Sequence, residues 1–422
     1  MDNETVPETF APGLAARLGP GLVTGAADDD PSGIATYSQM GAQFGYGLAW
    51  TMLFSFPLMA AIQAVSARIG CVTGRGIAAN LRRHYPRPVL AGVVCLLLVA
   101  NIFNLAADLG AMAAAVALLI GGPVLAYMVA FGVVCLLAET LISYAAYARY
   151  LKWATLSLFA YVAVVFTAGV DWGAALRGTL VPSFAFDRNH LFALVAVLGT
   201  TISPYLFFWQ AAQETEELRR RHIKALCLAP RQAGAELRRI RDDTLVGMGI
   251  SNAIALCIIF ATAATLHAHG ISQIDTAAQA AEALKPIAGP FAFVLFAAGI
   301  IATGMLAVPV LAGSAAYAVS ELFRWDEGLD RRPKEARWFY ATIAAATFAG
   351  MGLNLIGIDP IKALYWSAVL NGLLAAPVMV VTMLVATNPR AMGRLALPPH
   401  LVVGGWTATL VMALASALFL LM

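Results

Sequence analysis

Two apolar segments of this sequence are each interrupted by a proline and by polar residues that could bind a cation. The first carries three consecutive carboxylates, in the run Asp28, Asp29, Asp30 and Pro31. The second carries hydroxyl groups, in the run Gly199, Thr200, Thr201, Ile202, Ser203, Pro204 and Tyr205. A proline removes a backbone donor and disrupts the preceding helical turn, so carbonyl groups are left without partners. Carboxylate, hydroxyl and carbonyl oxygens are the ligands of hard divalent cations.

The composition places both interruptions in a multi-span membrane protein. Of the 422 residues, 60% are hydrophobic and 12% are charged, whereas soluble domains carry about 25% charged residues. A membrane-spanning helix needs about 20 apolar residues, and eleven stretches meet that requirement. They cover residues 15–42, 46–68, 88–118, 122–146, 150–170, 189–215, 244–268, 289–320, 337–357, 361–387 and 399–421.

Carboxylates at membrane depth need a compensating role, because one acidic residue at the centre of a spanning helix costs about 2.5–3.5 kcal/mol. A bound cation would be stabilised by the carbonyl end of a half-helix and by the charge of Asp30. The alternative is a structural kink whose free carbonyls are bridged by water or by Ser and Thr side chains. A second kink together with an aspartate cluster favours the cation site.

The distribution of basic residues predicts the orientation in the membrane. With a cytoplasmic N-terminus, nearly all of the 27 Lys and Arg residues fall in the N-terminal segment or in cytoplasmic loops, as the positive-inside rule requires. The exceptions are Arg177, Arg188, Lys285 and Lys362. We therefore expect a multi-pass protein of the inner (plasma) membrane, with a cytoplasmic N-terminus and an extracytoplasmic C-terminus.

The densest basic run, residues 219–241, is explained by neighbouring anionic lipid headgroups. No nucleic-acid-binding motif accompanies this run, so we expect the lipid bilayer and no nucleic acid as a partner. The glutamates before it are predicted to lie at the same membrane interface; they are Glu214, Glu216 and Glu217.

The two interruptions fall in spans 1 and 6, so five spans separate equivalent positions. An odd number of spans per repeat means that the second copy enters the membrane from the opposite side. Interrupted helices at corresponding positions of two inverted halves mark the binding site of transporters near the bilayer midplane. The sequence predicts one transmembrane domain over residues 1–422, with inverted repeats at about 15–170 and 189–388 and an extra helix at 399–421. It does not fix the oligomeric state, and a monomer would suffice.

Three motifs resemble the NRAMP family of divalent metal transporters: Gly19-Pro20-Gly21 through Asp30-Pro31, the segment Ser66–Gly76, and the segment Ala386–Gly393. The resemblance covers the first ten spans. It implies an all-α membrane protein with a LeuT-type fold of two five-helix inverted repeats, broken in helices 1 and 6. It also implies that the metal ion is the transported substrate rather than a cofactor, and that the protein is not an enzyme.

In that family, helix 1 carries Asp-Pro-Gly-Asn and helix 6 carries Met-Pro-His. The Asp, Asn and Met side chains hold the metal together with a backbone carbonyl three residues before the Met. By position, the resemblance assigns Asp30 and the carbonyl of Thr200 to the metal. Gly33 stands in place of the Asn and Ser203 in place of the Met. We expect Gly33 to offer a backbone carbonyl and Ser203 a hydroxyl or a water-mediated contact.

These two departures from the family motif predict which ion the protein transports. A thioether favours transition metals, so its loss should relax discrimination against Mg2+. Glycine removes side-chain volume, and Mg2+ gives up its water reluctantly. The pattern resembles the NRAMP-related magnesium transporters and predicts uptake of Mg2+ and Mn2+ by alternating access. A proton-coupled Mn2+ or Fe2+ transporter, and a LeuT-fold symporter of a small organic solute, are the alternatives.

Proton coupling is not expected, because most of the family's titratable residues are replaced. Proton-coupled members use two histidines in helix 6 and an Asp and a Glu in helix 3. The corresponding residues here are Tyr205, Gln210, Asp108 and Ala111. Only Asp108 can titrate near neutral pH, since a tyrosine has a pKa near 10. We therefore expect uptake to be driven by the membrane potential.

Other polar residues along the ion pathway allow two interpretations each. Asp28 and Asp29 could attract the cation, or could cap the broken helix and face water, with Ser32 beside them. Asp108 could be a remaining proton relay or could pair with backbone donors near helix 1. Asn371 could contact the hydration shell of the ion or form an interhelical hydrogen bond.

Overall fold

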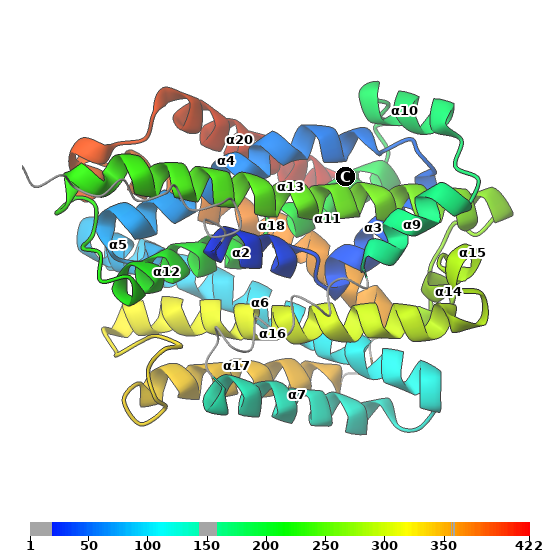
Figure 1. Cartoon of the computed structure of the whole chain (residues 1–422), viewed down its shortest axis with the longest axis horizontal. Coiled ribbons are helices and arrows are strands. Elements are labelled where there is room, and N and C mark those ends of the chain that lie inside the picture. The colour runs from blue at the N-terminus through cyan, green and yellow to red at the C-terminus, as the bar shows by residue number, and fades with distance from the viewer. Residues whose placement is uncertain (1–18, 143–157, 356, 358) are drawn as a thin grey trace, which may run out of the picture.

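The protein, described here by a computed structural model over residues 19–142, 158–355, 357 and 359–422, is a bundle of helices in which these residues form no strand. Its longer helices cross the bundle from end to end (Figure 1). The α-helices are α2 (Pro20–Asp28), α3 (Pro31–Phe44), α4 (Trp50–Thr73), α5 (Ile77–His84), α6 (Arg87–Ile120), α7 (Val124–Leu141), α9 (Phe159–Thr167), α10 (Trp172–Leu180), α11 (Arg188–Thr201), α12 (Pro204–Arg220), α13 (Ala233–Thr265), α14 (Ala277–Glu282), α15 (Lys285–Ala288), α16 (Ala292–Phe323), α17 (Arg337–Asn354), α18 (Pro360–Thr387), α19 (Pro389–Met392) and α20 (Pro399–Leu421).

Among the described residues, eight helical segments are long and apolar enough to cross a membrane. They contain α4, α6, α7, α11 with α12, α13, α16, α18 and α20. The other predicted spans correspond to the pair α2 and α3, to α9 and to α17. The last residues of the predicted span 122–146 and the first part of the predicted span 150–170 lie outside the described residues. The total of eleven spans therefore stays a prediction.

Helix α13, which contains the predicted seventh span, begins at Ala233, before the predicted start of that span at residue 244. Its first turns are charged, so hydropathy does not detect them. The guanidinium of Arg239 lies 3.0 Å from the Glu236 carboxylate one turn earlier. Such pairs, three residues apart on a helix, stabilise it outside the hydrocarbon.

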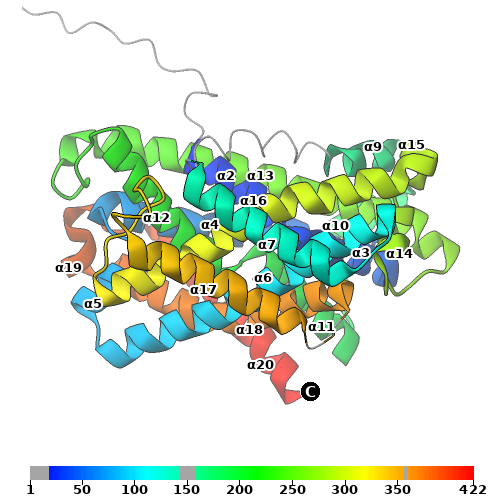
Figure 2. The ribbon, with the colours of Figure 1, turned by 90° about the horizontal axis from the view of Figure 1, so that it is seen from below.

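The two interrupted helices lie at the centre of the bundle and run in opposite directions. The chain passes from α2 to α3 toward one end of the bundle, and from α11 to α12 toward the other (Figure 1). On one side α6 and α16 pack together, with α7 and α17 outside them (Figure 2). On the other side α13 packs against α2, α3 and α4. This antiparallel pair agrees with the inverted relation expected of spans 1 and 6.

Backbone contacts through glycines hold the central helices close together. A Cβ atom on Gly25 of α2 would overlap the carbonyl group of Gly247 in α13. A Cβ atom on Gly199 of α11 would overlap the carbonyl oxygen of Ala368 in α18. Both helices that contain a break are therefore fixed by direct contact between backbones.

Replacing Gly199 with alanine should destabilise the protein by about 1–3 kcal/mol, the usual result of overpacking. Gly92→Ala is the matched control, because Gly92 also lies within a helix but has nothing within 4 Å of its Cβ position. There the change should be neutral or stabilising by up to about 1 kcal/mol, since alanine favours a helix. Thermal unfolding of the purified proteins in detergent compares the two. Equal melting temperatures would contradict the contact at Gly199.

Candidate functional site

The first break separates α2 from α3, and Asp30 forms its centre. Helix α2 ends at Asp28 and α3 begins at Pro31, so Asp29 and Asp30 lie between the two helices. Asp30 has extended backbone geometry and is the N-cap of α3. Its Oδ1 accepts hydrogen bonds from the Gly33 amide at 2.8 Å and from the Ser32 hydroxyl at 2.6 Å. An aspartate followed by proline is a favoured helix start, because proline at the first helical position needs no partner for a backbone N–H.

The second break separates α11 from α12, and the hydroxyl of Ser203 is hydrogen-bonded across it. Helix α11 ends at Thr201 and α12 begins at Pro204. The Ser203 hydroxyl donates to the carbonyl oxygens of Gly199 at 2.8 Å and Thr200 at 3.0 Å. A carbonyl oxygen has two lone pairs, so that of Thr200 keeps one for another ligand.

The two breaks face each other in the interior. The Tyr205 hydroxyl, in the first turn of α12, donates to Oδ2 of Asp30 at 3.2 Å and to the carbonyl of Ala27 at 3.2 Å. The hydroxyl oxygen of Thr200 lies 3.3 Å from the Cβ position of Gly33. Asp30, Gly33, Thr200 and Ser203 are all buried, so they share one enclosed region.

Gly33 has less free space around it than its small size suggests. Its Cβ position lies 3.2 Å from the Asp28 carbonyl oxygen and 3.3 Å from Cε2 of Tyr37. In this conformation, neighbouring atoms therefore occupy the room that glycine leaves. Gly33 is also in the first turn of α3, where a carbonyl points along the helix toward the amide four residues later.

Asp28 and Asp29 are held by α13, a contact that the sequence did not reveal. The Ser251 hydroxyl donates to Oδ2 of Asp28 at 2.7 Å and to Oδ1 of Asp29 at 3.1 Å. Both carboxylates are buried, so the interpretation that they face water is wrong. The available signal was the polar pair Ser251 and Asn252 within an otherwise apolar stretch.

Asp108 and Asn371 are buried side chains whose polar atoms have no hydrogen-bond partner among the described residues. Asp108 of α6 lies within electrostatic range of Asp30, and neither of its carboxylate oxygens has a hydrogen-bond partner among the described residues. The interpretation that it pairs with backbone donors is therefore wrong. The side-chain amide of Asn371 in α18 likewise has no partner in the described part of the chain, so the interhelical hydrogen bond is not observed.

The charge of these four aspartates is not balanced by protein cations. Across the described ranges, no Lys, Arg or His forms an ion pair with Asp28, Asp29, Asp30 or Asp108. Buried carboxylates without a partner are costly, so a cation or protons must neutralise them. The same residues contain no group of three or more His, Cys, Asp and Glu side chains arranged to hold a metal. A cation bound here would rely on few carboxylates together with hydroxyl, carbonyl and water oxygens.

Gln210 lies in a polar network that joins α2, α12 and α13 toward one end of the bundle (Figure 1). Its Oε1 accepts from the Thr24 hydroxyl, and its Nε2 donates to Glu214 at 3.1 Å. Glu214 pairs in turn with Arg239 of α13. Glu214 and Glu216 are buried, so they do not form an exposed face, and their position at the membrane interface stays a prediction.

Asp243 fixes the beginning of α2 to α13 at the same end of the bundle. Its carboxylate accepts from the amides of Gly19, Gly21 and Leu22 at 2.9, 2.7 and 3.0 Å. A carboxylate at a helix N-terminus is stabilised by the helix dipole. Neither Arg239 nor Asp243 was predicted, because their partners lie far away in the sequence.

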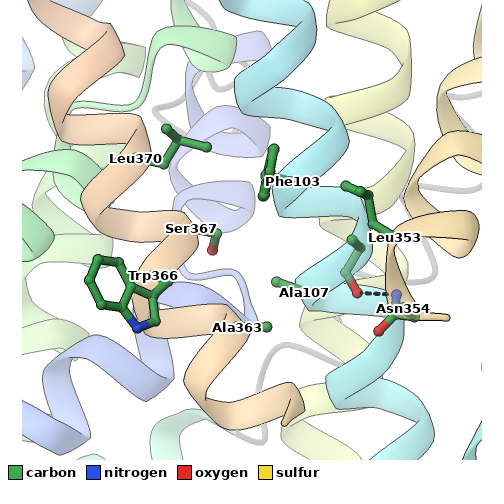
Figure 3. Close-up of a pocket in the computed structure, with 9 residues that line it drawn as sticks. Phe103, Ala107, Leu353, Asn354, Ala363, Trp366, Ser367 and Leu370 are labelled. Carbon is green, nitrogen blue, oxygen red and sulfur yellow. Dashed lines mark hydrogen bonds between the residues drawn. The ribbon is translucent and has the colours of Figure 1, made fainter. Parts of the chain in front are cut away.

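A cavity of about 610 Å³ lies between α6, α17 and α18. Two of its lining residues, Ala107 and Leu370, directly precede Asp108 and Asn371 in the sequence. Its walls are mostly apolar and include Phe103, Leu353 and Trp366 (Figure 3). Asn354 donates to the Ala106 carbonyl at 2.8 Å and so uses one of the few polar groups there. This lining offers no carboxylate, so the cavity is not a cation site.

Comparison with known proteins identifies the family. Residues 21–422 match the family described as natural resistance-associated macrophage protein-like (Nramp). The divalent metal cation transporter MntH of Burkholderia ambifaria is 28% identical over 426 residues, which cover 94% of this chain and 88% of that protein. MntH of Klebsiella pneumoniae is 26% identical, over 93% of this chain and 90% of that protein.

The fold agrees with this family match. The manganese transporter of Eremococcus coleocola superposes with a TM-score of 0.77 at 18% identity, over 97% of this chain and 87% of that chain. MhsT, in complex with L-phenylalanine, superposes with a TM-score of 0.64 at 13% identity, over 97% of this chain and 100% of that chain. These likenesses confirm the LeuT-type membrane fold. The match over nearly the whole chain shows that the protein belongs to the Nramp family of divalent metal transporters.

Proposed function

We propose that this protein takes up Mg2+ and Mn2+ by alternating access, with the metal ion as its substrate. The ion would bind between the two breaks. The N-terminus would face the cytoplasm, and so would the basic segment 219–241. Asp30 would supply the charge, Thr200 and Gly33 backbone carbonyls, and Ser203 a hydroxyl or a water-mediated contact.

The observation that carries this proposal is the set of buried carboxylates around the first break. Asp30 has one oxygen engaged as a helix cap and the other 3.2 Å from the Tyr205 hydroxyl. Asp28, Asp29 and Asp108 are three further buried carboxyl groups, and none of them pairs with a basic side chain in the described residues. An organic anion would be repelled by this arrangement, which argues against the solute symporter.

The choice of Mg2+ and Mn2+ rests on Ser203 and Gly33. Where the family motif has Met, Ser203 offers oxygen, which suits hard cations. The crowding around Gly33 means that a partly hydrated ion would require Tyr37 or the Asp28 backbone to move. Room for water thus depends on a change of conformation.

A proton-coupled Mn2+ transporter is the second candidate. The relatives named MntH and the solved manganese transporter favour Mn2+. Asp108, buried and without a hydrogen bond in the described structure, could carry a proton. The absence of histidine at positions 205 and 210 favours uncoupled uptake.

Ser203→Met should shift the preference of the protein from Mg2+ toward Mn2+ by about tenfold, a typical effect of single changes around a metal. Methionine adds a soft sulfur and removes the donor that Ser203 gives to Gly199 and Thr200. Uptake of Mg2+, Mn2+ and Ca2+ into proteoliposomes with entrapped fluorescent indicators measures the shift. Ser203→Ala is the control, because it removes the same donor without adding sulfur. Equal ion preferences in the two variants would contradict the ligand argument.

A further inference from the structure

A small pocket lies between α4, α13 and α20. Its lining residues come from the end of α4 and the beginnings of α13 and α20, and these parts of the helices lie on the left in Figure 1. The volume of the pocket is about 180 Å³. Arg68 of α4, Arg238 and Arg241 of α13, and His400 of α20 provide its polar lining. Leu237 and Leu401 provide apolar lining. Three separate helices thus bring basic side chains to one opening, whose lining includes no residue of the two breaks.

The positive charge in this pocket is only partly neutralised by the protein. The Arg68 guanidinium donates to the backbone carbonyls of Leu395 and Ala396, at 3.2 and 3.0 Å, which leaves its charge uncompensated. Arg238 has no ion pair within the described ranges. Arg241 pairs with Asp242 at 2.8 Å, but its side chain is 62% exposed.

The neighbouring Arg239 on the same helix shows that this exposure is specific to one face. Arg239 turns inward and pairs with Glu214 and Glu236. Arg238 and Arg241, three residues apart, lie on the other side of α13 and line the pocket. Helix α13 therefore uses one arginine inside the bundle and presents two to the surroundings.

The surface next to the pocket is apolar. Along α20, which begins beside the pocket, Val403, Leu410 and Leu414 are 65%, 58% and 54% exposed. In a membrane these side chains contact acyl chains. The site thus combines a basic opening with an adjoining apolar face, which matches a phospholipid better than a soluble anion.

We propose that this pocket binds the phosphodiester headgroup of an anionic phospholipid, with the acyl chains along α20. Arginines of the pocket contact the phosphate, and the apolar residues contact the upper part of the chains. The proposal is independent of which metal ion the protein transports. Basic pockets between transmembrane helices at the cytoplasmic face are suited to such headgroups.

Native mass spectrometry of the purified full-length protein tests this proposal with phosphatidylglycerol, phosphatidylcholine and inorganic phosphate as separate probes. We expect the wild-type protein to retain phosphatidylglycerol at least tenfold more strongly than phosphatidylcholine. Arg238→Gln with Arg241→Gln should weaken phosphatidylglycerol binding by about 10- to 30-fold, since each arginine near an anionic surface contributes about a fivefold effect.

Arg83→Gln with Arg87→Gln is the matched control, because it removes the same charge from exposed positions outside the pocket. This variant should retain phosphatidylglycerol within about twofold of the wild-type protein, the scatter expected of unrelated surface charges. Equal retention of the two lipids by the wild type would overturn the proposal, and this comparison does not depend on the folding of any variant. Equal loss in both double variants, or phosphate binding as tight as lipid binding, would overturn it as well.

Discussion

Asp30→Asn should reduce metal uptake by about 100-fold, equivalent to about 2.8 kcal/mol. Asparagine is as good an N-cap as aspartate, so the bonds to Gly33 and Ser32 can persist and α3 should still form. The variant loses the negative charge, which in the proposed site is the main attraction for a divalent cation. Uptake into proteoliposomes under an inside-negative potential, at several metal concentrations, measures the loss.

Asp187→Asn provides the matched control for that experiment. Asp187 is also an N-cap, that of α11, and its side chain accepts from the His190 amide at 2.9 Å. Hydrogen bonds from the His190 backbone and ring hold the pKa of Asp187 below its usual value, so the substitution removes a charge there too. We expect uptake close to wild type in this variant. If Asp30→Asn transports as well as Asp187→Asn, the site assignment is wrong.

An inside-negative potential of 100 mV should concentrate the metal about 2,000-fold in the vesicle interior at equilibrium. This follows from about 4.6 kcal/mol for a double charge, twice the single-charge value. A potassium gradient with valinomycin sets the potential, while indicators report the metal and the internal pH. In uncoupled transport the accumulation follows the potential and is unaffected by a pH gradient.

The proton-coupled alternative gives the opposite result in the same vesicles. Metal entry would then acidify the interior, and Asp108→Asn would remove the acidification. We expect neither metal-dependent acidification nor an effect of Asp108→Asn on proton flux. A clear acid signal with the wild-type protein would rule out uncoupled uptake.

The two breaks could be predicted from sequence because proline and aspartate have strong, local effects on an apolar helix. Asp30 needs no distant residue to become an N-cap, since its partners are Ser32 and Gly33. The opposite directions of the two interrupted helices followed from counting spans. These features depend on residue type and on spacing alone.

The partners of the aspartates could not be predicted, because they depend on how α13 is rotated against α2. Ser251 reaches Asp28 and Asp29 because the backbones of Gly25 and Gly247 are in contact. Hydropathy contains no information on this rotation. It likewise missed the first turns of α13, which begins at Ala233, since it recognises apolar residues but not a charged helix end that ion pairs stabilise.

The cap formed by Asp30 has a consequence for turnover. The same carboxylate that would hold the ion also holds the first turn of α3, through Oδ1. A cation that recruited both oxygens would have to displace this cap, which is worth about 1 kcal/mol. Binding of the ion through both oxygens and capping of α3 therefore compete for the same carboxylate. A transporter must release its substrate in every cycle, and this competition weakens ion binding and so favours release.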